Sequence, residues 1–327
     1  MIDRRLDRRV RGELSSLDFD WGNAYVGPDG EGGWVAWPSE AAEMAGAAAL
    51  EVEGRAILES PVEPLREEPA HAAALVSEAR QGELLMKLRQ EGEWWLVAGE
   101  DGYVAWMRSW NARSLGEGEL EAMLRRQVGV YAPAGGWFLP EDGGGVLLTG
   151  GTPLLAPQGF DPEASAALVL VELVDGRRGR LRSDEVESSL PDADPERLVH
   201  WAAEMVGSSY RWGGRSAGGM DCSGLAQWAA LRAGFDLPRD ARQQRGRGRP
   251  VSSSSGWRAG DLLFFGDPAD HVAIYDGRGG LVHARGRVVR QSLEEVGDLL
   301  GRLSAVRRLG ASDAIEGESL WRRRPGV

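Results

Sequence analysis

Cys222 is the one cysteine of the 327-residue chain, and its surroundings favour a chemical role. It directly precedes the apolar run LAQWAALRAG, which predicts a helix from about Ser223 to Ala233. A thiol at a helix N-terminus faces unpaired N–H groups, which lowers its pKa from about 8.5 toward neutrality. The N–H of Cys222 itself can stabilise an oxyanion on an attacked carbonyl. Cys222 is therefore a candidate nucleophile, and an inert packed cysteine is the alternative.

Two of the four histidines can serve such a nucleophile. A thiolate needs a base that later protonates the leaving amine. His271 begins a predicted strand, and His283 lies on the next strand, beyond the turn DGRGG. We expect both to face the helix of Cys222, one as the base and the other orienting it. His200, on a helix face, and His71, in a loop, are interpreted as structural.

Composition and charge exclude several classes of function. A single cysteine cannot form an intramolecular disulfide or a multi-cysteine zinc site, and we expect neither metal nor cofactor. The net charge is −12, divided into −18 over residues 1–196 and +6 over 197–327. An acidic front half argues against nucleic acid. The apolar runs fall short of the ~18 residues of a membrane helix, and the charged start leads us to expect no secretory signal. We expect a cytoplasmic monomer.

The order of the predicted elements divides the chain into five parts. Residues 1–55 are a mixed segment with helices expected over 3–14 and Ser39–Leu50. Residues 56–118 (the first module) and 119–190 (the second module) show short strands separated by Gly-rich turns, which predict two related small barrels. Residues 191–311 (the C-terminal domain) place helices before an antiparallel sheet, and residues 312–327 are expected to be a frayed polar tail.

The C-terminal domain also carries five motifs in order: YRWGGRSAGGMDCSGLAQWA, RDARQQ, WRAGDLLFF, DHVAIYDG and LVHARG. Together they resemble the NlpC-type cell-wall peptidases, a papain-like cysteine peptidase family, over about residues 192–310. The two modules resemble bacterial SH3-like domains, clearly in the first and weakly in the second. The resemblance implies an α+β fold: a papain-like NlpC-type catalytic domain, with helices packed on an antiparallel sheet, preceded by two small SH3-like β-barrels.

The resemblance also implies roles for particular residues. Cys222 would be the nucleophile, His271 the general base and acid, and His283 the orienting third residue. Tyr210 would place its hydroxyl near the thiol and the oxyanion. The expected pocket for a D-glutamyl residue is lined by Asp221 and Ser223 and extended by Arg239 and Asp240.

The architecture resembles that of the γ-D-glutamyl-diamino acid endopeptidases. In members that recycle cell-wall peptides, the first SH3-like domain closes the groove and admits only peptides with a free N-terminal L-alanine. We expect Tyr103 and one of Glu78 and Glu83 to hold that ammonium group; a core position for Tyr103 is the alternative. The arginine-rich insert 245–249 would contact substrate carboxylates or, as we favour, be solvated.

The expected activity is hydrolysis of the γ-D-glutamyl–diaminopimelate bond in free peptidoglycan stem peptides, such as L-Ala-γ-D-Glu-diaminopimelate. Diaminopimelate and lysine remain open at the third position. One alternative is a secreted lysin that cleaves intact peptidoglycan. A non-catalytic wall-binding protein, and an acyltransferase or amidase acting on another substrate, are weaker alternatives.

Overall fold

The N-terminal part of the chain forms a small sheet. The computed structural model describes residues 24–28, 34–38, 48–50, 53–158, 167–188, 192–315 and 320–321. Strands β1 (Ala24–Pro28), β2 (Trp34–Pro38) and β3 (Ala48–Leu50) pair antiparallel. The predicted helix over Ser39–Leu50 is therefore wrong at its end, because pairing with β2 overrides the helix preference of alanine. The predicted helix over 3–14 lies outside the described residues.

The first module is an antiparallel sheet of seven strands in the order β10-β4-β7-β8-β9-β5-β6. These strands are β4 (Gly54–Leu58), β5 (Val62–Arg66), β6 (Leu75–Arg80), β7 (Leu84–Glu91), β8 (Trp94–Ala98), β9 (Val104–Arg108) and β10 (Ala112–Ser114). The strands predicted from LVSEA, ELLMKLRQ, EWWLVAG and YVAWMR are confirmed.

The second module repeats part of this topology. Its elements are α1 (Glu119–Arg126), β11 (Gln127–Tyr131), β12 (Gly135–Phe138), β13 (Val146–Thr149), β14 (Pro153–Leu155), β15 (Leu168–Glu172), β16 (Arg178–Arg182) and β17 (Val186–Glu187). The order β17-β11-β14-β15-β16 matches β10-β4-β7-β8-β9 of the first module. A 3₁₀ turn precedes the last strand in each, at Ser109–Asn111 and Ser183–Glu185. The sequence analysis missed helix α1.

The two modules were expected to be small closed barrels, and the structure differs from this expectation. Among the described residues, no sheet closes into a barrel, and β6 and β10 stand at opposite ends of the first sheet. Strand β6 instead lies beside β18 (Arg215–Ser216) of the C-terminal domain. The N–H of Arg215 donates to Oε2 of Glu78 on β6 at 3.0 Å. The free edge of the sheet is thus covered by another domain rather than by its own last strand.

The C-terminal domain packs helices against an antiparallel sheet in the order β20-β25-β21-β22-β23-β24. The strands are β20 (Arg249–Pro250), β21 (Leu262–Phe265), β22 (His271–Tyr275), β23 (Gly280–Arg285), β24 (Arg287–Ser292) and β25 (Leu303–Arg308); a hairpin of β18 and β19 (Gly219–Met220) precedes them. The helices are α2 (Glu196–Glu204), α3 (Cys222–Arg232), α4 (Ala241–Gln244) and α5 (Gly297–Leu300). Reciprocal hydrogen bonds between Ser292 and Glu295 form just ahead of α5.

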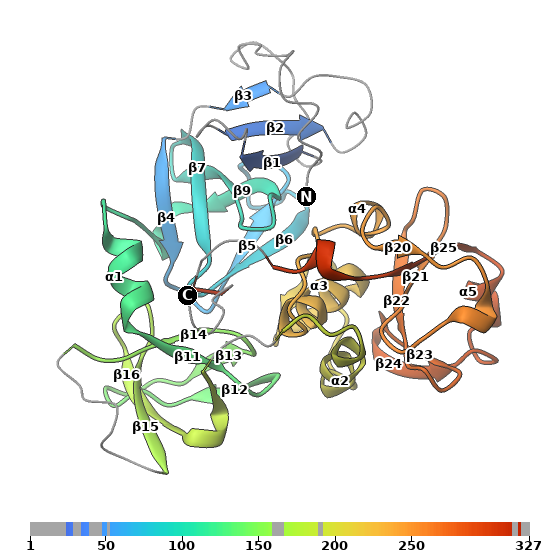
Figure 1. Cartoon of the computed structure of the whole chain (residues 1–327). Coiled ribbons are helices and arrows are strands. Elements are labelled where there is room, and N and C mark those ends of the chain that lie inside the picture. The colour runs from blue at the N-terminus through green and yellow to red at the C-terminus, as the bar shows by residue number, and fades with distance from the viewer. Residues whose placement is uncertain are drawn as a thin grey trace.

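Helix α3 lies at the centre of the molecule, between the sheet of the C-terminal domain and the two modules (Figure 1). All of its eleven residues are buried. Because buried polar groups need partners, the polar groups of α3 connect the domains. Nε2 of Gln227 donates to Asp101 of the first module at 2.9 Å. Nε1 of Trp228 donates to the carbonyl of Gly150, and Arg232 pairs with Glu187, both in the second module.

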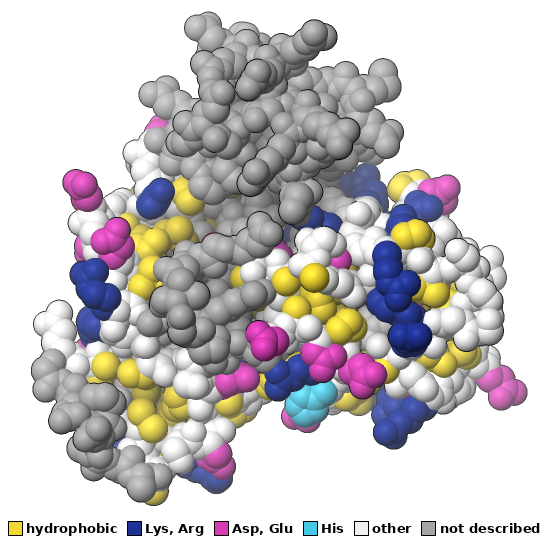
Figure 2. Space-filling model, in the orientation of Figure 1, with side chains coloured by type: hydrophobic (Ala, Val, Ile, Leu, Met, Phe, Trp, Pro, Cys, Tyr) yellow, Lys and Arg dark blue, Asp and Glu magenta, His cyan; other side chains and the backbone are white. Residues whose placement is uncertain are grey.

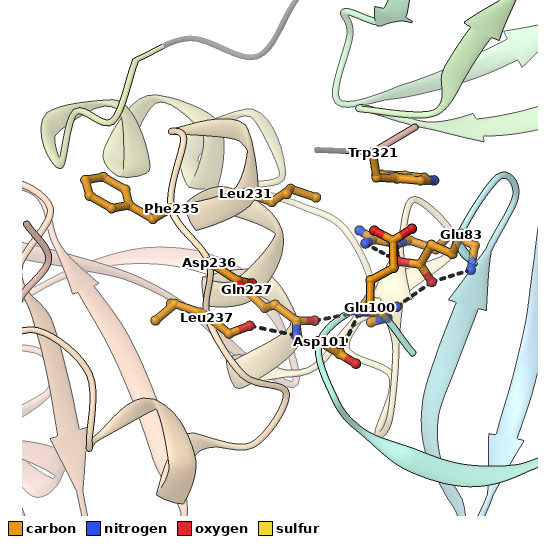
Figure 3. Close-up of a pocket in the computed structure, with 11 residues that line it drawn as sticks. Glu83, Glu100, Asp101, Gln227, Leu231, Phe235, Asp236, Leu237 and Trp321 are labelled. Atoms are coloured by element: carbon orange, nitrogen blue, oxygen red, sulfur yellow. Dashed lines mark hydrogen bonds and ion pairs between the residues drawn. The ribbon is translucent and has the colours of Figure 1, made fainter. Parts of the chain in front are cut away.

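A buried ion-pair network joins the first module to the C-terminal domain (Figure 3). Arg215 donates to Glu83 at 2.5 Å and to Asp101 at 2.9 Å. Arg80 donates to Glu83 as well, through its backbone N–H and its guanidinium. Removing one partner of such a buried pair leaves an uncompensated charge, which is strongly destabilising. The network therefore fixes how the first module docks.

Residues 312–315 and 320–321, the described part of the chain beyond 311, differ from the predicted frayed tail. Ile315, Leu320 and Trp321 are almost fully buried. The indole N–H of Trp321 donates to the carbonyl of Gln81 at 2.9 Å, and its ring lies under the guanidinium of Arg80. The ring also faces Gly151 of the second module and packs with Leu231 of α3. An aromatic side chain that fills a gap between three units resists fraying.

Replacement of this anchor is expected to destabilise the protein. Trp321→Ala should lower the free energy of unfolding by about 3 kcal/mol, the usual cost of truncating a buried aromatic side chain. Trp137→Ala is the matched control, because Trp137 is 67% exposed. Denaturant unfolding of both variants measures the difference. Equal midpoints for the two would contradict the anchoring role of Trp321.

Candidate active site

Cys222 is the first residue of helix α3, as the sequence predicts to within one position. Asp221 caps the helix: its Oδ1 accepts from the N–H of Gly224 at 2.7 Å. Gly224 is required here, because a Cβ at this position would collide with the carbonyl oxygen of Gly214. The cap leaves the N–H of Cys222 without an intrahelical acceptor, as at every helix start. The thiol of Cys222 and the free N–H of the same residue are thus held close together.

Arg239 holds the capping residue Asp221 in place through two hydrogen bonds. Nη1 and Nη2 of Arg239 donate to the two oxygens of Asp221 at 3.0 and 2.6 Å. Ser223 accepts from Nη1 of Arg239 at 2.8 Å and donates to Asp221. All three residues are buried beside the thiol. Their contact with a D-glutamyl residue stays a prediction.

The two candidate histidines hydrogen-bond to each other. Nε2 of His271 lies 2.8 Å from Nδ1 of His283. His271 begins β22 opposite Phe265 of β21, and the two rings pack against each other. Val272 and Ile274 of the same strand pack in the core with α3. Because side chains alternate along a strand, the side chain of His271 leaves β22 on the face opposite Val272 and Ile274. That both histidines face the helix of Cys222 stays a prediction.

The sulfur of Cys222 contacts the backbone of strand β22. The N–H groups of Val272 and Ser223 donate to it, which places the thiol beside the residue that follows His271. Burial nevertheless raises the pKa of Cys222 to about 11, and the Asp221 carboxylate adds to the rise. The predicted lowering of this pKa by the helix start is therefore wrong, because desolvation of the thiolate outweighs these N–H groups.

The pKa of His271 is lowered, whereas that of Cys222 is raised. Burial lowers its pKa from 6.5 to about 4, with further lowering by His283 and Arg285. Burial also lowers the pKa of His283. At neutral pH the site therefore holds a protonated thiol and a neutral imidazole. A neutral imidazole can accept the thiol proton when sulfur attacks.

Tyr210 lies near this pair. It is half-buried against the core that contains Cys222. Burial, followed by the proximity of Cys222, raises its pKa to about 12. The hydroxyl therefore stays protonated and is able to donate a hydrogen bond.

The structure gives two of the residues expected at an amine site another role. Glu83 is paired with Arg80 and Arg215, and Glu78 is paired with Arg211 at 2.6 Å. Both carboxylates are almost fully buried. Their charges are already neutralised by arginines where the first module docks, so they are weak candidates for binding an ammonium group.

Tyr103 takes the core position that was considered as the alternative for it, and its contact with an ammonium group stays a prediction. Its ring belongs to the core of the first module and is 3% exposed. Burial raises the pKa of its hydroxyl, and Asp240 and Asp101 add to the rise. Burial also raises the pKa of Asp240. The hydroxyl of Tyr103 therefore lies at the boundary with the C-terminal domain, close to two carboxylates.

The remaining candidates lie on other elements. His200 is exposed on α2 beside Trp201, and His71 is exposed beside Trp94 of the first module. Figure 2 shows Lys and Arg side chains gathered on the C-terminal domain, at the right of the view. In the insert 245–249, Arg245 pairs with Asp267 at 2.8 Å and Arg249 is exposed.

Three residues that form hydrogen bonds here were missed by the sequence analysis. Asp101 and Arg215 build the boundary between the first module and the C-terminal domain. Oε1 of Gln291 on β24 lies 3.0 Å from Nε2 of His283. Gln291 lies on the strand that follows His283, but one amide on a strand has no distinguishing pattern in the sequence alone.

Two further properties concern the described part of the chain. It contains no group of three or more His, Cys, Asp or Glu side chains that could hold a metal ion. None of its helices is long and apolar enough to cross a membrane.

The lowered pKa of His271 predicts a pH-dependent stability. An imidazole that stays neutral in the folded protein but protonates near 6.5 when unfolded destabilises the fold as pH falls from about 6.5 toward about 4. Between pH 7 and pH 5, the parent should lose about 2 kcal/mol more unfolding free energy than His271→Gln. Denaturant titrations at both pH values measure this difference.

The control for this experiment is His200→Gln, which removes an exposed histidine from α2. It should keep the pH dependence of the parent. Parallel pH dependences for the parent and His271→Gln would show that His271 ionises normally.

Comparison with known proteins finds a family that part of the chain resembles. Residues 207–300 match the model of the NlpC/P60 family. Dipeptidyl-peptidase 6 of Lysinibacillus sphaericus is 35% identical over 130 residues, 38% of this chain and 47% of that protein. Gamma-D-glutamyl-L-lysine dipeptidyl-peptidase of Bacillus subtilis is 36% identical over 121 residues, 35% of this chain and 40% of that protein. The chain thus spans less than half of these relatives.

The fold is shared more widely than the sequence. The crystal structure of an NlpC/P60 family protein from Bacillus cereus ATCC 10987 covers 78% of this chain and 99% of its own, at 19% identity and a TM-score of 0.67. That overlap extends beyond residues 207–300 and shows a common fold. Cys222, His271 and His283 all lie within residues 207–300, so the candidate site is contained in the segment that matches the NlpC/P60 family model.

Proposed function

We propose that this protein is a cysteine peptidase that cleaves peptidoglycan stem peptides. The observation that carries the proposal is the arrangement of Cys222 at the start of α3 beside β22, where His271 is hydrogen-bonded to His283. The family match and the names of the relatives support a peptidase.

The proposed reaction begins with the neutral thiol and imidazole. His271 accepts the thiol proton as the sulfur attacks the carbonyl carbon, and its N–H to His283 keeps the ring oriented. The tetrahedral oxyanion collapses to a thioester when protonated His271 gives its proton to the leaving amine. Water, deprotonated by His271, then hydrolyses the thioester and restores the thiol.

Two donors would stabilise the oxyanion in this proposal. The N–H of Cys222 has no intrahelical acceptor, and the Tyr210 hydroxyl stays protonated because its pKa is raised. Donors held in place before the reaction stabilise developing charge without reorganisation.

The proposed substrate is the γ-D-glutamyl–diamino acid bond of a stem peptide such as L-Ala-γ-D-Glu-diaminopimelate. The name of the Bacillus subtilis relative, which includes gamma-D-glutamyl-L-lysine, supports this bond. Asp221, Ser223 and Arg239 would form the wall next to the D-glutamyl residue.

We further propose that the enzyme acts on free peptides in the cytoplasm and recognises their N-terminal amine. Tyr103 and Asp240 support such a site, because the negative charge of Asp240 acts on the tyrosine hydroxyl where the first module faces the C-terminal domain. A buried carboxylate attracts an ammonium group strongly.

Loss of the thiol should abolish hydrolysis. Cys222→Ala is expected to lower kcat/KM for L-Ala-γ-D-Glu-diaminopimelate by at least about 10³-fold, because no covalent intermediate can form. Mass spectrometry of the products measures it, and His200→Gln serves as the control. Cleavage by Cys222→Ala at the parental rate would refute the proposed function.

The amine proposal predicts selectivity for a free N-terminus. Acetylation of the L-alanine amine should reduce kcat/KM by at least about tenfold, the effect of one lost charge-assisted hydrogen bond. A panel of free and acetylated peptides, with diaminopimelate or lysine at the third position, measures this effect.

Intact sacculi provide the second arm of that experiment, and they should release nothing until other enzymes free the peptides. Direct release from sacculi, or equal cleavage of acetylated and free peptides, would instead indicate a lysin of intact peptidoglycan.

A further inference from the structure

Three polar side chains on neighbouring strands form a continuous hydrogen-bonded chain. Nε2 of His271 on β22 lies 2.8 Å from Nδ1 of His283 on β23. Nε2 of His283 in turn lies 3.0 Å from Oε1 of Gln291 on β24. His283 is fully buried, so its two ring nitrogens depend on these partners.

The strand register explains why the three side chains meet. Leu281 pairs with Gln291, and His283 pairs with Val289, two residues along both strands. Because side chains alternate along a strand, Gln291 is a diagonal neighbour of His283 on the same face. An extended amide side chain spans such a diagonal.

The chemistry of the amide sets the direction of every hydrogen in this chain. Oε1 of Gln291 accepts only, so the single proton of neutral His283 lies on Nε2. Nδ1 of His283 then carries a lone pair and accepts from Nε2–H of His271. The lone pair of His271 is left on Nδ1, its remaining ring nitrogen.

We propose that Gln291 is a positioning residue, which fixes the tautomer of His283 and thereby leaves the basic lone pair of His271 on Nδ1, where it can accept the proton of Cys222. This inference rests on the proposed function and adds a residue to its machinery.

The opposite tautomer shows what Gln291 prevents. A proton on Nδ1 of His283 would point at Nε2 of His271 and turn that nitrogen into an acceptor. His271 would then carry its own proton on Nδ1 and could not accept one from the thiol. A wrong imidazole tautomer stops general-base catalysis even where the geometry of the site is intact.

The charged groups around His271 and His283 do not set the tautomer of His283. Arg285 on β23 lowers the pKa of both histidines, and Asp298 on α5 raises that of His283. Arg285 and Asp298 pair with each other at 2.9 Å. Asp270 and Arg302, which act on His271, form a second ion pair at 2.5 Å. Both pairs are more than half exposed at their side chains, so solvent screens them. The part-buried hydrogen bond between His283 and Gln291 then sets the tautomer.

The test uses Gln291→Leu, which removes the acceptor, and Gln90→Leu, the same substitution at an exposed position on β7. The readout is the alkylation rate of Cys222 by iodoacetamide as a function of pH, which needs no substrate. In the parent, the rate should rise as His271 loses its proton, stay level through neutral pH, and rise again as the thiol ionises near pH 11. Gln291→Leu should lower the neutral plateau by at least about tenfold, because His271 no longer presents its lone pair.

A second variant keeps the proposal falsifiable if Gln291→Leu does not fold. Gln291→Glu retains an acceptor and adds a negative charge that stabilises imidazolium. Its neutral plateau should stay within about threefold of the parent, while its acidic limb moves to higher pH by about one unit. An unmoved acidic limb in Gln291→Glu, or a Gln291→Leu profile equal to that of Gln90→Leu, would overturn the proposal.

Peptide hydrolysis by the same proteins separates this proposal from the proposed function. If the parent cleaves no stem peptide but the alkylation profiles differ as expected, the substrate assignment is wrong and the positioning role stands. If the parent cleaves the peptide and Gln291→Leu cleaves it equally well, the function stands and the positioning role is wrong.

Discussion

The burial of helix α3 on all sides is the constraint on which the rest of the structure depends. A helix inside a protein can carry polar side chains only when each of them has a partner, because an unpaired polar group costs several kcal/mol of desolvation. In α3 the partners come from other parts of the chain: Gln227 bonds to the first module and Arg232 to the second. The helix that holds Cys222 is therefore fixed in position by both modules as well as by its own sheet.

The same burial decides the ionisation of the site. A thiol at an exposed helix start would ionise readily, but Cys222 is enclosed beside the Asp221–Arg239 pair and keeps its proton. His271 is enclosed as well and stays neutral. Cys222 and His271 are therefore both uncharged in the resting protein. They become charged only when the sulfur attacks a substrate carbonyl. The direction of proton transfer then depends on hydrogen bonds inside the sheet rather than on solvent.

The sequence predicted the features that depend on local order. Asp-Cys-Ser-Gly before an apolar run predicted the helix start, and two histidines on a hairpin predicted the hydrogen-bonded pair. It did not predict pairings such as Arg215 with Glu83, whose partners are 132 residues apart. The raised pKa of Cys222 was also not predicted. It results from burial by segments distant in the sequence, whereas the prediction considered only the position of Cys222 at the start of a helix. Gln291 was missed because one amide on a strand has no distinguishing pattern until the register places it beside His283.

The anchor at Trp321 has a consequence for the order of assembly during synthesis. The first module, the second module and helix α3 all leave the ribosome before this residue does. Each can form its own hydrogen bonds early, but the space between Arg80, Gly151 and Leu231 is filled only when the indole arrives. The contacts of the indole with the modules around the site therefore form only after the modules and helix α3 have themselves been synthesised.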